Sequence, residues 1–86
     1  MPYISFELRE VINEYLAGIG NNISTAGELN YCFTVLMKYY LKKNNKSYKT
    51  LNDCIGVLEA AKLEFYRREV SIYEDLKKDI NGDIQI

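Results

Sequence analysis

The sequence predicts an all-α protein: a short N-terminal helix plus an antiparallel hairpin of two longer helices, assembled at least as a dimer. Apolar side chains recur every three or four residues along three segments, which is the spacing of helices with a buried face. Each segment starts at a capping residue, and turn-rich stretches separate the segments. Because the chain has 86 residues, of which 48% are hydrophobic, we expect a single domain over residues 1–86.

The first helix is expected from about Phe6 to Ala17. Ser5 is a suitable N-cap because its hydroxyl can accept a hydrogen bond from a free backbone N–H, and Gly18 and Gly20 are expected to end the helix. The apolar side chains of this segment share one face: Leu8, Val11, Ile12, Tyr15, Leu16 and Ile19. This face is predicted to pack against the other helices.

The second helix is expected to begin at a capping box, with Thr25 at the N-cap and Glu28 three residues later, and to run to about Lys43. Its main apolar stripe consists of Leu29, Cys32, Phe33, Leu36, Met37 and Tyr40. A second, partly apolar face consists of Tyr31, Val35 and Tyr39. Two such faces on one helix predict two neighbouring elements.

The third helix is expected to start at Ser47 or Thr50 and to continue to about Lys78, before Asn81-Gly82 ends it. A helix of that extent is about 43 Å long, well beyond the length of the second. Its predicted stripe is Leu51, Cys54, Ile55, Leu58, Phe65, Ile72 and Leu76. One shorter partner within the chain cannot cover the far half of this stripe, so the overhang predicts self-association.

Composition narrows the range of functions. The formal net charge is −1, so no basic field favours long nucleic acid. The chain contains no histidine, which removes the commonest general base and most zinc sites. Its two cysteines are too few for a secreted disulfide scaffold, no apolar run is long enough to span a membrane, and Met1–Glu7 lacks the pattern of a signal peptide. We therefore expect a cytoplasmic protein without catalysis, cofactor or metal.

The most informative segment is Glu64–Glu69, because it places two arginines beside aromatic and acidic residues on one helix. The planar guanidinium groups of Arg67 and Arg68 suit phosphate or carboxylate groups. Arg68 can pair with Glu64 four residues earlier, which would make it a surface ion pair of small energetic value. Arg67 has no acid four residues away and is expected to be the freer of the two. A solvated charged face is the alternative interpretation.

Further residues are candidates for the same ligand site. Tyrosine rings can stack on a base, although tyrosines at helical spacing are more often core residues. Charged side chains in the middle of an apolar stripe must be paired or face a ligand, so Lys62 and Glu69 could instead bridge two subunits. The expected ligand-binding set is Arg67, Arg68, Tyr66, Tyr31, Asn30, Tyr73, Lys62 and Glu69.

Several short motifs together resemble a small family of uncharacterised phage and prophage proteins. They are Met1-Pro2-Tyr3-Ile4, Gly27-Glu28-Leu29-Asn30-Tyr31, Ser47-Tyr48, Ile55-Gly56-Val57-Leu58-Glu59, Glu64-Phe65-Tyr66-Arg67-Arg68, Tyr73-Glu74-Asp75 and Asn81-Gly82-Asp83. The resemblance extends over nearly the whole chain. Small oligomeric phage proteins include sponges that bind nucleotide immune signals without cleaving them, and the analogy extends that role to this chain.

The leading hypothesis is therefore an anti-defence protein that sequesters a cyclic dinucleotide or a cyclic ADP-ribose isomer in pockets at subunit interfaces of a homo-oligomer. In this hypothesis the arginines hold phosphates, with Lys62 in support, the tyrosines stack, and Asn30 and Glu69 bind polar edges. The alternative is a helical module that inhibits a host protein through hot-spot arginines and tyrosines. A third hypothesis is an enzyme that uses Glu64, Glu69 or Asp75 with a metal.

Overall fold

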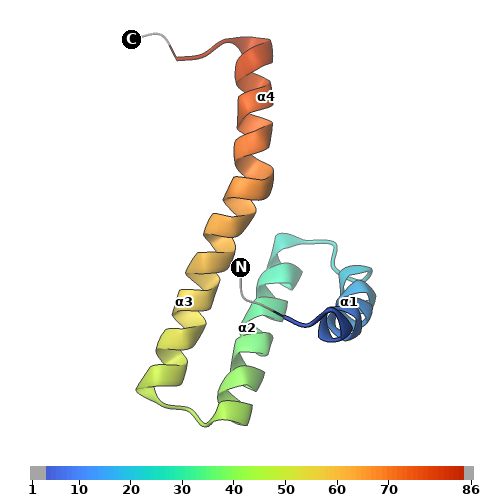
Figure 1. Cartoon of the computed structure of the whole chain (residues 1–86), viewed down its shortest axis with the longest axis vertical. Helices are drawn as coiled ribbons and strands as arrows, with labels where there is room; N and C mark the ends of the chain where they lie inside the picture. Colours follow the sequence, from blue (N-terminus) through green and yellow to red (C-terminus); the bar gives the residue numbers. More distant parts are fainter. Residues whose placement is uncertain (1–3, 85–86) are drawn as a thin grey trace. The chain divides into compact units, whose positions relative to one another are not determined.

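The computed structural model describes residues 4–84, and within them the chain consists of helices and short connections, without any strand (Figure 1). The elements are α1 (Phe6–Gly20), α2 (Ala26–Asn44), α3 (Tyr48–Phe65), η1 (Tyr66–Val70) and α4 (Ser71–Asn81). Since α3, η1 and α4 follow one another without a break, they form the single third helix that the sequence predicts. The all-α class is confirmed, while the opening Met1-Pro2-Tyr3 motif lies outside the described residues.

The chain divides into two compact units, Met1–Lys46 and Ser47–Ile86. The first unit contains α1 and α2, and the second contains the third helix. The candidate site residues are therefore described unit by unit, and the single domain over residues 1–86 stays a prediction.

Helix α1 begins where expected but ends later. The Leu8 N–H donates to the hydroxyl of Ser5 over 3.2 Å, which confirms the N-cap. The helix continues through Gly18 to Gly20, so the expected end at Ala17 is wrong. Glycine disfavours a helix interior by only about 1 kcal/mol relative to alanine, too little to stop a helix whose neighbours favour it. The Asn22 side-chain amide donates to the Gly18 carbonyl over 3.0 Å and satisfies an acceptor in the last turn.

We expect Gly18→Ala to stabilise the protein by about 0.4–1 kcal/mol, because alanine has less conformational freedom to lose on folding. A Cβ atom at Gly18 would meet no heavy atom within 4 Å, so there is room for it. Urea unfolding at a fixed protein concentration measures the effect. Gly82→Ala is the matched control and should destabilise, since Gly82 has a φ of +90°. A destabilised Gly18→Ala variant would contradict the expectation.

Helix α2 begins at the predicted capping box. The Glu28 N–H donates to the Thr25 hydroxyl over 3.1 Å, and the Thr25 N–H donates back to the Glu28 carboxylate over 3.0 Å. The Ser24 N–H donates to the same carboxylate over 2.7 Å. These backbone hydrogen bonds, led by the one from Ser24, lower the pKa of Glu28. The helix ends at Asn44, one residue beyond the expected Lys43.

The third helix begins with a second capping box, which decides between the two expected caps in favour of Ser47. The Thr50 N–H donates to the Ser47 hydroxyl over 3.2 Å, and the Ser47 N–H donates to the Thr50 hydroxyl over 2.8 Å. At the other end the helix runs to Asn81, beyond the expected Lys78, and Gly82 terminates it in a left-handed conformation that glycine tolerates.

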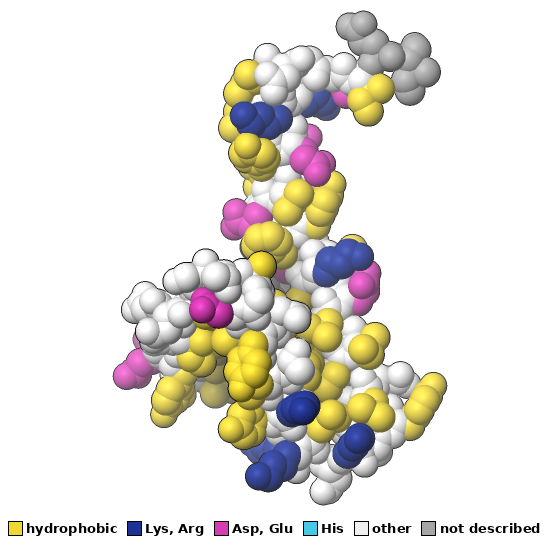
Figure 2. Space-filling model, turned by 180° about the vertical axis from the view of Figure 1, so that it is seen from behind, with side chains coloured by type: hydrophobic (Ala, Val, Ile, Leu, Met, Phe, Trp, Pro, Cys, Tyr) yellow, Lys and Arg dark blue, Asp and Glu magenta, His cyan; other side chains and the backbone are white. Residues whose placement is uncertain are grey.

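Few of the described side chains are covered. Among residues 4–84 only Thr50 and Cys54 are buried, and the apolar faces of α1, α2 and the third helix are largely exposed. Figure 2 shows many hydrophobic side chains, in yellow, at the visible surface. The predicted stripes therefore exist as apolar faces of the individual helices. Faces of this kind are the usual surfaces on which a helix packs against a neighbouring element or molecule.

Candidate functional site

The third helix changes its hydrogen-bonding pattern in the segment that carries both arginines. Residues Tyr66–Val70 form a π-helical turn, in which the N–H of Ser71 donates to the carbonyl of Tyr66, five residues earlier. In a regular α-helix the Ser71 N–H would donate to the Arg67 carbonyl. That carbonyl instead accepts from the hydroxyl of Ser71 over 2.9 Å. The serine side chain thus supports the local change of pitch.

Both arginines bind the same carboxylate. The Arg68 Nε donates to Glu64 Oε1, and Arg67 Nη2 donates to the same oxygen over 3.3 Å. The pairing of Arg68 with Glu64 confirms the expectation. Arg67, expected to be the freer of the two, is more exposed than Arg68 (73% against 56%), but it also pairs with this acid, which lies three residues before it. The hydrogen bond from Arg68, followed by that from Arg67, lowers the pKa of Glu64. Glu64 therefore stays ionised and keeps the two guanidinium groups together.

Tyr66 and Tyr73 are positioned by charged neighbours on α4. The Tyr66 hydroxyl donates to Glu74 Oε2 over 2.8 Å, and this bond to a negative group raises the pKa of the phenol. The Lys77 ammonium lies 5.6 Å from the centroid of the Tyr73 ring, within cation–π range. The bond from Tyr66 to Glu74 spans eight residues, and the π turn between them brings the two side chains to the same side of the helix.

The structure describes Lys62 and Glu69 in the isolated chain only. Lys62 is exposed, and its ammonium pairs with Glu59 over 3.4 Å, not with Glu69. Within the described residues no hydrogen bond or ion pair of the Glu69 side chain is found, and this side chain is exposed in the isolated chain. Neither charge is therefore buried in the isolated chain. The polar pocket and the bridge between subunits both remain proposals that require a partner.

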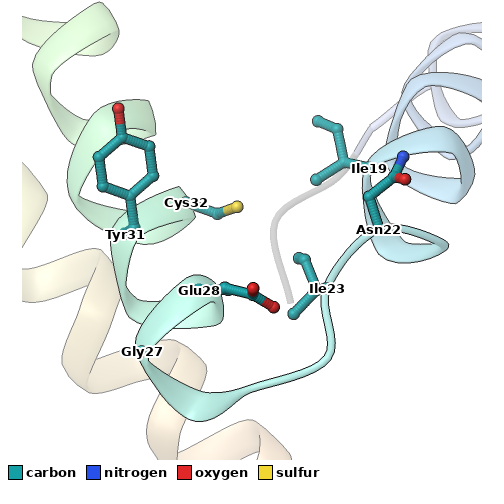
Figure 3. Close-up of a pocket in the computed structure, with 7 residues that line it drawn as sticks. All are labelled: Ile19, Asn22, Ile23, Gly27, Glu28, Tyr31 and Cys32. Carbon is teal, nitrogen blue, oxygen red and sulfur yellow. The ribbon is translucent and has the colours of Figure 1, made fainter.

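Asn30 and Tyr31 belong to the other unit and lie on α2. Tyr31 is exposed, and it lines an open hollow of about 510 Å³ where the connection from α1 enters α2 (Figure 3). The remaining lining residues, which are not in the expected ligand-binding set, are Ile19, Asn22, Ile23, Gly27, Glu28 and Cys32. Glu28 places a carboxylate in this hollow, where it accepts hydrogen bonds from the N–H groups of Ser24 and Thr25 just before the helix. The hollow is thus a poor site for phosphate.

The cluster of Glu64, Arg67 and Arg68 has capacity left for an anion. Each guanidinium group carries five N–H donors, and each arginine uses one nitrogen in its bond to Glu64. Both side chains are more than half exposed, so a phosphate can approach them. The cluster is held by its own carboxylate and is open on its outer side, an arrangement that favours binding of an anion over chemistry on it.

Metal sites and membrane-spanning helices are two other features that bear on function. Among residues 4–84 no three cysteine, aspartate or glutamate side chains converge as metal ligands. In the same part of the chain, no helix combines the length and the apolar character required to traverse a lipid bilayer.

The sequence as a whole matches one protein family. The model of a family described as Domain of unknown function (DUF6899) matches residues 1–84, which include nearly all of both units. This confirms the uncharacterised family that the sequence motifs led us to expect. Comparison with curated proteins and with solved structures gives no match.

Proposed function

We propose that this chain, which belongs to the DUF6899 family, is a phage-type binding protein that sequesters a nucleotide-derived immune signal without catalysis. The observation that carries the proposal is the position of the π-helical turn, Tyr66–Val70, on the segment that also carries Arg67 and Arg68. A π turn is rare and most often occurs at functional sites, because it sacrifices regular helix geometry to place particular side chains. Here the π turn contains two arginines, whose guanidinium groups suit phosphate, beside the aromatic ring of Tyr66.

The chemistry of these side chains supports a ligand with phosphate and base moieties. The paired guanidinium groups suit a phosphate, and the rings of Tyr66 and Tyr73 offer faces for stacking. The chain contains no histidine, so general acid–base catalysis would have to use less suitable groups. Binding and retention of the signal in the host cytoplasm therefore explain more of the residues than its turnover does.

The proposal includes assembly of several copies, because the described helices leave their apolar faces uncovered. In the proposed assembly α2 and the third helix form a hairpin, and a homo-oligomer places Asn30 and Tyr31 near the arginines of the same or another copy. Glu69 and Lys62 then meet groups of the ligand or of the second copy. A cyclic dinucleotide or a cyclic ADP-ribose isomer has the phosphates and bases that such a site would bind.

The test is to incubate the purified protein with a panel of cyclic dinucleotides and cyclic ADP-ribose isomers and to follow binding by native mass spectrometry. We expect one member of the panel to bind, and heat denaturation to release it chemically unchanged. Chromatography of the released nucleotide separates a sponge from an enzyme. Recovery of a cleaved product would favour the third hypothesis, a metal-dependent enzyme. If no member of the panel binds, both the sponge and the enzyme are contradicted.

The second candidate function is a helical module that occupies a host protein. The specific observation in its favour is that large apolar side chains, including Phe65, Tyr73 and Leu76, are exposed on one helix. Recovery of one host protein in stoichiometric amount, with no nucleotide bound to the chain, would favour this candidate.

A further inference from the structure

The apolar stripe of the third helix keeps to one side of the helix because of the π turn. Its central members are Leu58, Ala61, Phe65, Glu69, Tyr73 and Leu76. The interval is four residues at each of the three steps from Ala61 to Tyr73, which is longer than the 3.6 residues of an α-helical turn. The wider π turn accommodates these longer intervals. Tyr73 therefore continues these intervals into α4, whereas a uniform α-helix would bring Ile72 to this side.

The same stripe is symmetric about Arg67 in the middle of the π turn. Leu58 and Leu76 are equally distant from Arg67 along the chain, and so are Ala61 and Tyr73. Phe65 and Glu69 form the innermost pair. A helix face with this symmetric spacing can pair with an identical face that runs in the opposite direction. Each residue then lies level with the residue that is equally distant from Arg67 on the other side.

We propose that a second copy of this chain packs antiparallel on this face, with a twofold axis at the level of Arg67. Such a contact is isologous, since the same surface patch serves both copies. In this register the small Ala61 lies opposite the large Tyr73 of the second copy, so that the two surfaces interlock. Leu58 lies opposite Leu76. Phe65 lies opposite Glu69, whose carboxylate has to stay in contact with water at the edge of the seam, because a buried charge without a partner is costly.

The spacing of the face favours a second copy as the occupant, because an identical helix in the opposite direction repeats the same intervals. On the proposed face, Phe65, Tyr73 and Leu76 are 62%, 59% and 53% exposed, so the surface is available to a partner.

The pairing also defines the class of ligand, in an argument that rests on the proposed function. On a helical projection Arg68 lies beside the stripe, on the same flank as Glu64. In an antiparallel pair this flank of both copies borders one side of the seam, so the two Arg68 groups come close to the axis. Each Arg68 is already paired with its own Glu64, but its guanidinium group has further N–H donors that can bind an anion between the two copies. A ligand with two phosphates related by twofold symmetry fits, which selects a cyclic dinucleotide over an ADP-ribose isomer.

Disulfide cross-linking tests the pairing without any ligand. In a background that carries Cys32→Ser and Cys54→Ala, we expect Leu58→Cys combined with Leu76→Cys to form a covalent dimer under mild oxidation. The two positions are about 27 Å apart within one helix, too far for an internal disulfide. Each single variant is the matched control and should remain uncross-linked. Circular dichroism verifies that the helix content of every variant is retained.

Each outcome decides the proposal. A covalent dimer from Leu58→Cys alone would indicate a parallel pair and overturn the antiparallel one. The proposal is also overturned by a helical double variant that does not cross-link, or by wild-type protein that is monomeric in light scattering at the protein concentration used for cross-linking. With the pairing established, native mass spectrometry with cyclic di-GMP and other cyclic dinucleotides should find one ligand for two chains. One ligand for each chain would overturn the shared site only, while no ligand at all would contradict the proposed function and leave the pairing intact.

Discussion

Replacing both Arg67 and Arg68 by alanine is expected to weaken binding of the nucleotide ligand by a factor of about 10²–10⁴. A hydrogen bond to a charged group contributes about 1.5–3 kcal/mol, and the double variant removes at least two of them. Each 1.4 kcal/mol corresponds to a factor of ten in affinity. Isothermal calorimetry with the panel member that the wild-type protein binds measures the loss.

The control for this double variant is Arg9→Ala, which removes an exposed arginine from α1 in the other unit. It should bind as the wild-type protein does. The double variant should keep its helix content, because its ion pairs with Glu64 are exposed and contribute little to stability. An affinity unchanged by the double substitution would remove both arginines from the site.

Local signals in the sequence predict the starts of the helices. The caps at Ser5, Thr25 and Ser47 depend only on side chains within a few residues of the helix start, so their motifs are visible without the fold. The ends are less predictable, because a glycine such as Gly18 costs little in a helix and its neighbours decide. The N-terminal ends of the helices were therefore predicted more accurately than their C-terminal ends.

The π turn was not predicted, although the sequence contains a signal for it. A projection at a uniform 100° for each residue assigns Ile72 to the stripe, and a constant period cannot represent a local change of pitch. The three successive four-residue intervals from Ala61 to Tyr73 are that signal. The same assumption of a uniform helix concealed the bond from Tyr66 to Glu74, because the two residues come into line only after the pitch changes.

The residue types predicted the chemistry of the site more reliably than they predicted which residues pair with one another. The pairing of Arg68 with Glu64 follows from a four-residue spacing, but the pairing of Arg67 with the same acid was not expected, because only that spacing was considered. An arginine is long enough to reach an acid three residues earlier as well. Whether Tyr31 and Asn30 join the arginines depends on contacts between units or copies, and such contacts leave no local pattern in a sequence.

Replacing Leu76 by aspartate is expected to dissociate the antiparallel pair. Burial of a leucine side chain stabilises by about 1.5–3 kcal/mol, and a twofold pair contains the substitution twice. The aspartate would in addition place a charge without a partner inside the contact. The dissociation constant should therefore rise by a factor of about 10² or more. Sedimentation velocity over a range of protein concentrations measures this change.

Leu63→Asp is the matched control, because it makes the same chemical change on the same helix. Leu63 is 60% exposed, slightly more than Leu76, but on a helical projection it lies on the side opposite the stripe. It should leave the dissociation constant within a factor of about three. If both variants dissociated the assembly equally, general damage to the helix would explain the result. If only Leu63→Asp dissociated it, the contact would lie on the other face, and the symmetry about Arg67 would have no role in assembly.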